Sequence, residues 1–262
     1  MNDGDGMNDG GRMTIDINCD MGEGIGNDEA IMPYISSANI ACGYHAGDEN
    51  SMRRTVELAM QYRVAIGAHP SYPDRKHFGR VDLLGDPGIR IADLPQLLTD
   101  QLIILQKICS EYGAGLHHVK PHGALYNRAA KDPAVSAILC ETIRQFDPSL
   151  LLYGLTGSAM KAEAERCGLR FVQEVFADRS YREDGSLVPR NEAHALIEEP
   201  ALAVRQVLIM VQKGRVLATS GETISLAAGT VCIHGDGAHA PVLVRAIYEA
   251  LVEGSIAIQA PV

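Results

Sequence analysis

The sequence lacks the features that mark nucleic-acid-binding, membrane and secreted proteins. It contains no run of lysine and arginine, and its 262 residues carry a formal net charge of -10. Because binding to a phosphate backbone relies on clustered cations, we do not expect a nucleic-acid partner. No apolar run approaches the roughly 20 residues that span a bilayer, and the first dozen residues are polar and acidic. We therefore expect a cytoplasmic protein that is neither membrane-bound nor secreted.

The sequence also lacks a Cys-x-x-Cys pair, although it contains six cysteines scattered through apolar segments. This distribution indicates neither a zinc site of that type nor a disulfide framework. Cys19, Cys42 and Cys232 lie beside the polar motifs described below. Their isoleucine and alanine neighbours suit packing better than stabilisation of a thiolate, so we predict buried thiols rather than nucleophiles.

Length and composition indicate one folded domain. A hydrophobic content of 46% is enough to form a large core, and α/β barrels commonly use about 250 residues as a single domain. Residues 1–12 repeat Met-Asn-Asp-Gly and show no periodicity. We predict a flexible N-terminal extension over these residues, followed by a single domain over residues 13–262.

Strand-like and helix-like patterns alternate along this domain. Short β-branched or apolar runs predict strands at residues 14–19, 38–42, 64–68, 116–119, 150–155, 171–176 and 230–233. Helical periodicity predicts helices at residues 50–63, 93–112, from 133 onward, 158–168, 200–213 and 241–253. In the second helix, Asp93 followed by Gln96 is typical of a capping box. The alternation implies right-handed βαβ units, and hence a parallel sheet or a closed barrel.

Three segments interrupt the alternation. Residues 71–87, rich in proline, glycine and charge, and residues 178–190 predict long loops on the functional side of the fold. Residues 217–226, with a Ser-Gly pair in the middle, predict a small hairpin before the last strand.

Polar side chains recur at every second position near the ends of the predicted strands. In the first strand Asp16, Asn18 and Asp20 alternate with apolar residues, so a pleated strand points all three to one side. The same spacing occurs in three later strands, and two further strands end near a histidine; these residues are His118, Lys120 and His122, Glu174 and Asp178, His234 and Asp236, and His45 and His69.

Ionisable residues at the ends of six strands converge in space only if the strands are parallel and form a ring. That is the arrangement that builds active sites in α/β barrels. The alternative is that each group is satisfied separately by the backbone or by a neighbouring helix. Because burial of so many ionisable groups is costly unless they pair, we predict one shared site.

A glycine-rich run after the first strand does not match a nucleotide-binding loop. Residues 21–26 lack the lysine and the serine or threonine of a P-loop, and their glycine spacing differs from the dinucleotide fingerprint. We therefore do not expect this chain to bind ATP by itself.

At these motifs the sequence resembles the LamB/YcsF family, the A subunits of bacterial 5-oxoprolinases. The matching segments follow one another over nearly the whole domain. They are Asp16-Ile-Asn-Cys-Asp20-Met-Gly-Glu-Gly24, Ala38-Asn-Ile-Ala-Cys-Gly-Tyr-His45-Ala-Gly-Asp48, Gly67-Ala-His69-Pro-Ser-Tyr-Pro-Asp74, Val119-Lys-Pro-His122-Gly-Ala-Leu-Tyr-Asn127, Glu174-Val-Phe-Ala-Asp178-Arg179 and His234-Gly-Asp236. The sequence departs from the family pattern at a few loop positions, among them His194, where glycine is usual.

The resemblance implies an irregular (β/α)7 TIM-like barrel of the glycoside hydrolase and deacetylase type. It also implies a place in a multi-subunit, ATP-hydrolysing complex. In that scheme subunits B and C use ATP to activate the lactam of 5-oxoproline (pyroglutamate), and a chain of this kind completes its opening to L-glutamate. Whether the chain also forms a homo-oligomer is left open.

For that reaction we predict a catalytic set at the strand ends and a substrate-binding set around it. The catalytic set is Asp20, His45, His69, Lys120, His122, Glu174, Asp178, His234 and Asp236. The substrate-binding set is Asn18, Glu23, Asn39, Tyr72, Asn127, Arg179 and Arg190.

Individual roles follow from the difficulty of opening a stable amide. We assign Asp20, poised by His45 or His69, as the base for water. Lys120 then stabilises developing oxyanion or phosphate charge, and His122 donates a proton to the leaving nitrogen. The remaining catalytic residues are expected to orient these groups and the substrate amine.

Two other functions are compatible with the same residues. One is a metal-dependent amide or carbohydrate deacetylase, because Asp20, His45 and His69 form a common ligand set for a divalent metal. The spacing has no compact metal signature, so metal dependence is left open. The other is a non-catalytic subunit that presents substrate to subunits B and C.

Overall fold

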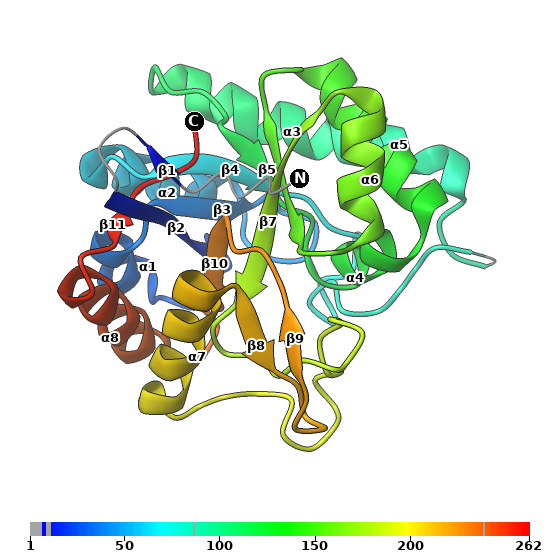
Figure 1. Ribbon diagram of the computed structural model, residues 1–262. Helices are drawn as coiled ribbons and strands as arrows, with labels where there is room; N and C mark the ends of the chain where they lie inside the picture. The colour runs from blue at the N-terminus through cyan, green and yellow to red at the C-terminus, as the bar shows by residue number, and fades with distance from the viewer. Residues whose placement is uncertain (1–6, 9–11, 86, 238) are drawn as a thin grey trace.

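Parallel strands close into a barrel that is surrounded by helices (Figure 1). The computed structural model describes residues 7–8, 12–85, 87–237 and 239–262. Within these ranges the barrel has seven parallel strands, and pairing of the first with both the second and the last closes it. The strands are β2 (Arg12–Met21), β3 (Ser37–Ala41), β4 (Ala65–His69), β5 (His118–Val119), β6 (Leu151–Leu155), β7 (Arg170–Phe176) and β10 (Thr230–Ile233). The predicted irregular (β/α)7 barrel is confirmed.

Helices cover the outside of the barrel, with α5 and α6 on one side in Figure 1 and α7 and α8 on the other. They are α1 (Asp28–Ile31), α2 (Glu49–Tyr62), α3 (Leu94–Glu111), α4 (Gly123–Lys131), α5 (Pro133–Phe146), α6 (Ala159–Cys167), α7 (Pro200–Lys213) and α8 (Ala240–Glu253), with 3-10 turns η1 (Met32–Tyr34) and η2 (Ile91–Asp93). No helix in the described ranges has the length and apolar character needed to cross a membrane.

Most predicted helix ends agree with the structure for the expected reasons. Asp132 accepts hydrogen bonds from the first backbone N–H groups of α5, and Pro133 occupies its first turn. Gly168 and Gly214 adopt the left-handed conformation that ends α6 and α7. The capping role predicted for Asp93 is wrong, because its carboxylate instead accepts hydrogen bonds from the Arg90 guanidinium at 2.6 and 2.7 Å.

Several short elements were not expected from the sequence. Helix α4 begins at Gly123, directly after a Lys-Pro-His run that is more typical of a turn. Strand β11 (Ala257–Ile258) pairs in parallel with the start of β2, at Thr14 and Ile15. The hairpin that was predicted is present as β8 (Arg215–Leu217) and β9 (Thr223–Ser225). Strand β1 (Met7–Asn8) pairs antiparallel with the start of β2. The other residues of the predicted extension before Arg12 lie outside the described ranges.

The pleat of β2 separates polar from apolar side chains. Ile15, Ile17 and Cys19 are buried in the hydrophobic core between the barrel and its helices. Asp16 points into the barrel, where its carboxylate accepts hydrogen bonds from Ser36, Ser37 and Thr230 at 2.5 to 2.8 Å. Burial outweighs these hydrogen bonds and raises the pKa of Asp16. Polar side chains therefore fill the barrel interior from the middle of β2, and not only at the carboxyl ends of the strands.

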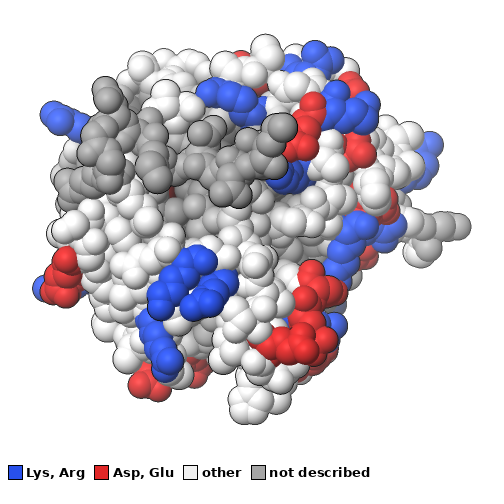
Figure 2. Space-filling view, in the orientation of Figure 1, with Lys and Arg blue, Asp and Glu red and all other residues white. Residues whose placement is uncertain are grey.

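The outer surface carries charge of both signs in small groups. On the face seen in Figure 2, a group of basic side chains lies over α7, and acidic side chains lie near the β8–β9 hairpin. Charge is therefore dispersed on this face, whereas the charged groups of the barrel interior converge.

One close approach inside the barrel predicts a strong effect on stability. A Cβ atom at Gly67 would lie 2.0 Å from Nε2 of His118. The His118 ring cannot move away easily, because it stacks on Tyr153 at 4.0 Å and its Nε2 bonds the side chain of Asn39 at 2.8 Å. We expect Gly67→Ala to lower the free energy of unfolding by about 1–3 kcal/mol, measured by urea denaturation.

Gly115→Ala is the matched control, because no atom lies within 4 Å of the Cβ position there. A Gly67→Ala protein as stable as the Gly115→Ala protein would contradict the tight packing of the barrel interior.

Candidate active site

A cavity of about 400 Å³ opens at the carboxyl ends of the barrel strands. It is lined by residues from separate strand ends and from the loops that follow them. Members of the predicted sets that line it are Asp20, Glu23, His69, Lys120, His122, Asn127, Arg179, Arg190, His234 and Asp236. The structure thus brings together side chains that are far apart in the sequence.

Lys120 lies at the centre of this site and is almost fully buried. Its Nζ atom is 2.9 Å from Oδ1 of Asp20 and 2.9 Å from Oε1 of Glu174. It also donates to Oδ1 of Asn18 at 3.1 Å and contacts Sγ of Cys232 at 3.0 Å. Burial opposes the charge of Lys120, but the adjacent Asp20, Cys232 and Glu174 outweigh it and hold the pKa of Lys120 well above its ordinary value. The ammonium group is therefore a fixed buried cation.

Asp20 joins this cation to the histidines. Its Oδ1 contacts Lys120, and its Oδ2 lies 3.3 Å from Nε2 of His69. Burial alone would raise the pKa of Asp20, but charges on His69 and Lys120 outweigh it and leave the pKa well below 3.8. Asp20 is therefore a carboxylate at neutral pH, and it lines the cavity.

A layer of amides and hydroxyls lies beneath the cavity and fixes these charged groups. Asn39 donates to the side-chain oxygens of Asn18 and Asp20, both at 2.8 Å, and Asn18 donates to Glu174 at 3.0 Å. The hydroxyl of Tyr126 donates to the other oxygen of Glu174 at 2.7 Å. Asn18, Asn39 and Glu174 do not line the cavity, so the structure places them as supports of Lys120 and Asp20.

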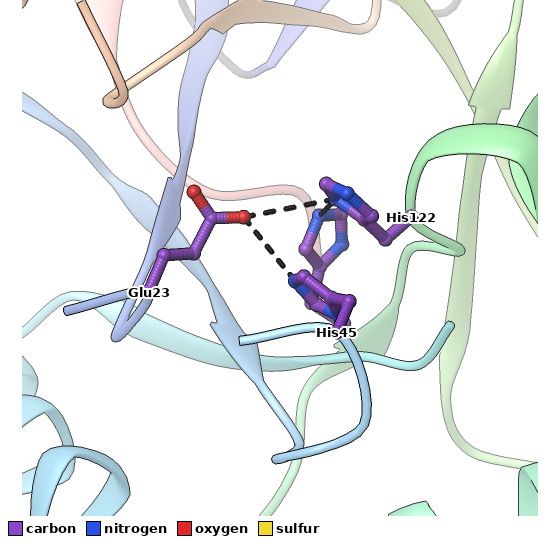
Figure 3. Close-up of side chains that lie close together, drawn as sticks. Glu23, His45 and His122 are labelled. Atoms are coloured by element: carbon purple, nitrogen blue, oxygen red, sulfur yellow. Dashed lines mark hydrogen bonds and ion pairs between the residues drawn. The ribbon is translucent and has the colours of Figure 1, made fainter. Parts of the chain in front are cut away.

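Three histidines and one glutamate form a compact group at one wall of the cavity (Figure 3). The rings of His45 and His122 stack with centroids 3.9 Å apart. Glu23 points toward both rings, with Oε1 at 3.3 Å from Nε2 of His45 and 3.7 Å from Nδ1 of His122. His45 lies behind His122 and does not itself line the cavity.

Burial controls the charge of this group. It lowers the pKa of His45 to about 3, with a further contribution from charge on His69. Burial and charge on His69 also hold the pKa of His122 well below its ordinary value. Burial, followed by the charge of Asp20, raises the pKa of Glu23 well above its ordinary value. His45 and His122 are therefore neutral at neutral pH.

Another part of the cavity lining is formed by His234, which pairs with Asp178, and by arginines. Nδ1 of His234 is 2.8 Å from Oδ2 of Asp178. Asp178 therefore orients the His234 ring, although Asp178 itself does not line the cavity. Asp236 accepts a hydrogen bond from Arg80 at 2.5 Å, and Arg190 lies 3.9 Å away from the same carboxylate. Arg80 was not predicted from the sequence, although it lies within the loop of residues 71–87 that was expected on this side.

Tyr72 and Arg179, two residues of the predicted substrate-binding set, make contacts that stabilise the fold. Tyr72 is fully buried in the hydrophobic core and is not among the lining residues, because apolar side chains surround its ring. Arg179 lines the cavity, but its guanidinium donates to the backbone carbonyls of Val188 and Ala195 at 2.5 and 3.4 Å. Arg179 therefore holds the loop after β7 in place. At the end of this loop His194 has a φ of 62°, the left-handed region that favours glycine.

The thiols near the site are protonated. Burial raises the pKa of Cys42 to about 12 and holds the pKa of Cys19 well above its ordinary value. Burial also keeps the pKa of Cys232 well above its ordinary value, despite the adjacent Lys120. These surroundings support the interpretation of the three cysteines as packing residues.

A carboxylate, neutral imidazoles, a fixed cation and arginines around one cavity can move protons and stabilise negative charge. Fold and cavity thus define an α/β-barrel protein with acid–base groups at the carboxyl ends of its strands. The chain belongs to the LamB/YcsF family, whose family model matches residues 15–262. The family resemblance predicted from the sequence is confirmed.

Relatives of the chain match it over nearly their whole length. A protein of Bordetella parapertussis, named as the A subunit of 5-oxoprolinase, is 48% identical, covering 94% of this chain and 98% of the relative. A Staphylococcus aureus protein of the same name is 45% identical, covering 94% and 99%. The chain also resembles the crystal structure of a lactam utilization protein from Thermus thermophilus, with a TM-score of 0.88. The two sequences are 37% identical, and the match covers 95% of this chain and all of that chain.

The buried ion pair predicts a pH-dependent defect when its cation is removed. In the native protein the pKa of Asp20 is below its unfolded value, so its contribution to stability is present above about pH 4 and lost only as the pH falls through the folded-state pKa. In Lys120→Met the carboxylates of Asp20 and Glu174 lose their cation, and the folded-state pKa of Asp20 rises. We therefore expect Lys120→Met to be destabilised by about 3–5 kcal/mol near pH 8 and by less near pH 5.

Urea denaturation at the two pH values measures this difference. Lys107→Met is the control, because Lys107 is exposed on α3. Equal loss of stability at both pH values would show that the carboxylates do not depend on Lys120 for their charge.

Proposed function

We propose that this chain is the hydrolytic A subunit of an ATP-dependent 5-oxoprolinase, which opens 5-oxoproline to L-glutamate with partner subunits B and C. Its relatives that carry the name of the 5-oxoprolinase A subunit support the substrate. The observation that carries the proposal is the contact of Asp20 with both Lys120 and His69 at the floor of the cavity. In the proposed reaction Asp20 is the base, with the cation of Lys120 and the imidazole of His69 in contact with it.

In the proposed reaction the partner subunits transfer a phosphoryl group from ATP to the lactam oxygen. Asp20 removes a proton from water as the water oxygen bonds to the activated carbon. The carbon–nitrogen bond then breaks, and the nitrogen receives the proton that Asp20 has taken from water. The product at this stage is an acyl phosphate, and a second water releases inorganic phosphate and leaves glutamate.

The buried cation has an electrostatic role in this scheme. Lys120 is held between two carboxylates and cannot leave its position without breaking both contacts. It therefore lowers the energy of negative charge that develops above Asp20, rather than carrying a proton. Glu174, Asn18 and Asn39 keep Lys120 and Asp20 in register beneath the substrate.

The arginines of the cavity wall fit the anionic groups of the proposed substrate. 5-Oxoproline carries a carboxylate, and its activated form carries a phosphate in addition. Arg80 is already paired with Asp236, whereas Arg190 is 3.9 Å from that carboxylate and partly exposed. Arg190 is therefore the cation that is freer to bind an incoming carboxylate.

Reconstitution tests the proposed function. The chain is mixed with candidate B and C subunits, ATP and 5-oxoproline, and glutamate is measured with each component omitted in turn. We expect glutamate only in the complete mixture, and Asp20→Asn is expected to lower its rate by a factor of about 10²–10⁴. The control Asp100→Asn, whose carboxylate bonds Gln96 on α3, should retain the native rate.

Other outcomes of this experiment identify the alternative functions. Full activity in Asp20→Asn with impaired assembly would show a non-catalytic, substrate-presenting role. Release of acetate from an acetylated amide or sugar without ATP would show a deacetylase.

Removal of Arg190 tests its role in substrate binding. We expect Arg190→Ala to raise KM for 5-oxoproline about 10- to 100-fold while kcat changes little, because one charge-assisted hydrogen bond to the substrate is lost. Arg245→Ala is the control, since Arg245 is exposed on α8 and pairs with Glu249. A fall in kcat at unchanged KM would contradict a role in ground-state binding.

A further inference from the structure

The histidine–glutamate group at the cavity wall has the composition of a metal site. Glu23, His45, His69 and His122 each offer one ligand atom, and these atoms all lie within 4.8 Å of one another. They come from four segments: the loop after β2, the loop after β3, the end of β4 and the start of α4. The hydrogen bonds that fix the ring nitrogens decide whether an ion suits this group.

Backbone carbonyls fix which nitrogen of two rings carries the proton. Nδ1 of His69 lies 2.7 Å from the carbonyl oxygen of Lys120, so it carries a hydrogen and donates it. Nε2 of His122 lies 2.9 Å from the carbonyl oxygen of Phe78 and donates in the same way. In the neutral rings the lone pairs therefore belong to Nε2 of His69 and Nδ1 of His122.

These two lone pairs face each other. Nε2 of His69 and Nδ1 of His122 are 2.8 Å apart, and neither atom has a hydrogen to donate in the neutral rings. Two acceptors at this distance repel each other unless a cation lies at or beside them. A backbone carbonyl that fixes the far nitrogen of a histidine is also the usual outer contact of a metal-binding ring.

Buried carboxylates beside the group favour a cation there. Lys120 contacts Asp20 and Glu174, whereas the carboxylate of Glu23 faces the rings of His45 and His122. A cation bound among the imidazoles therefore has its charge balanced by Glu23.

We propose that Glu23, His45, His69 and His122 bind a divalent transition-metal ion of the zinc class. Three imidazoles with one carboxylate suit zinc, iron, cobalt or nickel, whereas magnesium and calcium prefer oxygen ligands alone. Ion binding at this wall does not depend on the identity of the substrate proposed above.

The distances within the group fit such an ion after a small adjustment. Bonds of about 2.0–2.1 Å in a tetrahedral arrangement separate the ligand atoms by about 3.4 Å. The Glu23 oxygen is 3.3 and 3.7 Å from the nitrogens of His45 and His122, while His69 and His122 need to move apart from 2.8 Å. Figure 3 shows one oxygen of the Glu23 carboxylate pointing toward a nitrogen of both stacked rings.

A second cluster, formed by Asp20, Cys232 and His234, also has atoms that could bind a metal, but the ammonium group of Lys120 already contacts it. Lys120 contacts Asp20 at 2.9 Å and Cys232 at 3.0 Å, so its ammonium group takes the place an ion would need. The two clusters therefore divide the site into one half neutralised by lysine and one half in which the carboxylate of Glu23 faces imidazoles. Glu23, His69 and His122 line the cavity, so a bound ion is accessible from it.

Direct measurement of ion binding tests this proposal without an activity assay. The full-length protein is stripped with a chelator and titrated with Zn²⁺ by calorimetry, and with Co²⁺ by visible absorption. We expect one ion per chain and a cobalt spectrum of a four- or five-coordinate nitrogen–oxygen site. His122→Ala and Glu23→Gln should each weaken binding by a factor of about 100 or more, since each removes a ligand.

The variants separate ion binding from folding. Glu23→Gln keeps the shape of the side chain and removes its charge, so it is informative even if His122→Ala fails to fold. His239→Ala is the matched control, because His239 is exposed before α8 and should bind the ion as the native protein does. Absence of stoichiometric binding, or equal affinity in Glu23→Gln and the native protein, would overturn the proposal. Glutamate formation by the chelated complex would leave the proposed function intact while removing any need for the ion in catalysis.

Discussion

The contact of the Lys120 ammonium group with the carboxylates of Asp20 and Glu174 is the constraint on which the rest of the site depends. A lysine at this depth is tolerated only because acidic partners surround it, and the carboxylates are tolerated only because the lysine is there. Strands β2, β5 and β7 supply or directly precede the three residues, so the interaction joins strands that are not neighbours in the barrel. The buried ion pairs of Lys120 therefore contribute both to the stability of the barrel and to the arrangement of the site.

The two halves of the cavity differ in how their charge is balanced. On one side Asp20 and Glu174 share the lysine, with amides of Asn18 and Asn39 satisfying the remaining lone pairs. On the other side Glu23 lies among neutral imidazoles, and burial raises its pKa. This asymmetry places a carboxylate that is charged at neutral pH beside groups whose charge depends on a proton or an ion. The proposed hydrolysis of an activated amide uses both kinds of group in one cavity.

The sequence predicted the barrel and the convergence of its polar residues, because both follow from local periodicity. Alternation of Asp16, Asn18 and Asp20 in β2 is sufficient to direct them inward once the strands are known to be parallel. Helix α4 was missed because a glycine and a proline at its start are typical of turns, while tertiary packing decides its helical state. Tyr72 lies in a segment that matches the family and was assigned to the substrate-binding set, yet apolar neighbours from other segments surround its ring. Such contacts between distant loops leave no periodic signal, which is also why Arg80 was not identified.

The charge state of Asp20 in the folded protein is the most direct test of the buried ion pair. Selective ¹³C labelling of aspartate, with Asp20→Asn used to assign the signal, allows the carboxylate to be titrated by NMR. We predict that the pKa of Asp20 lies well below 3.8, because of the charges on His69 and Lys120. A pKa at or above that value would contradict the buried ion pair from which the proposed chemistry follows.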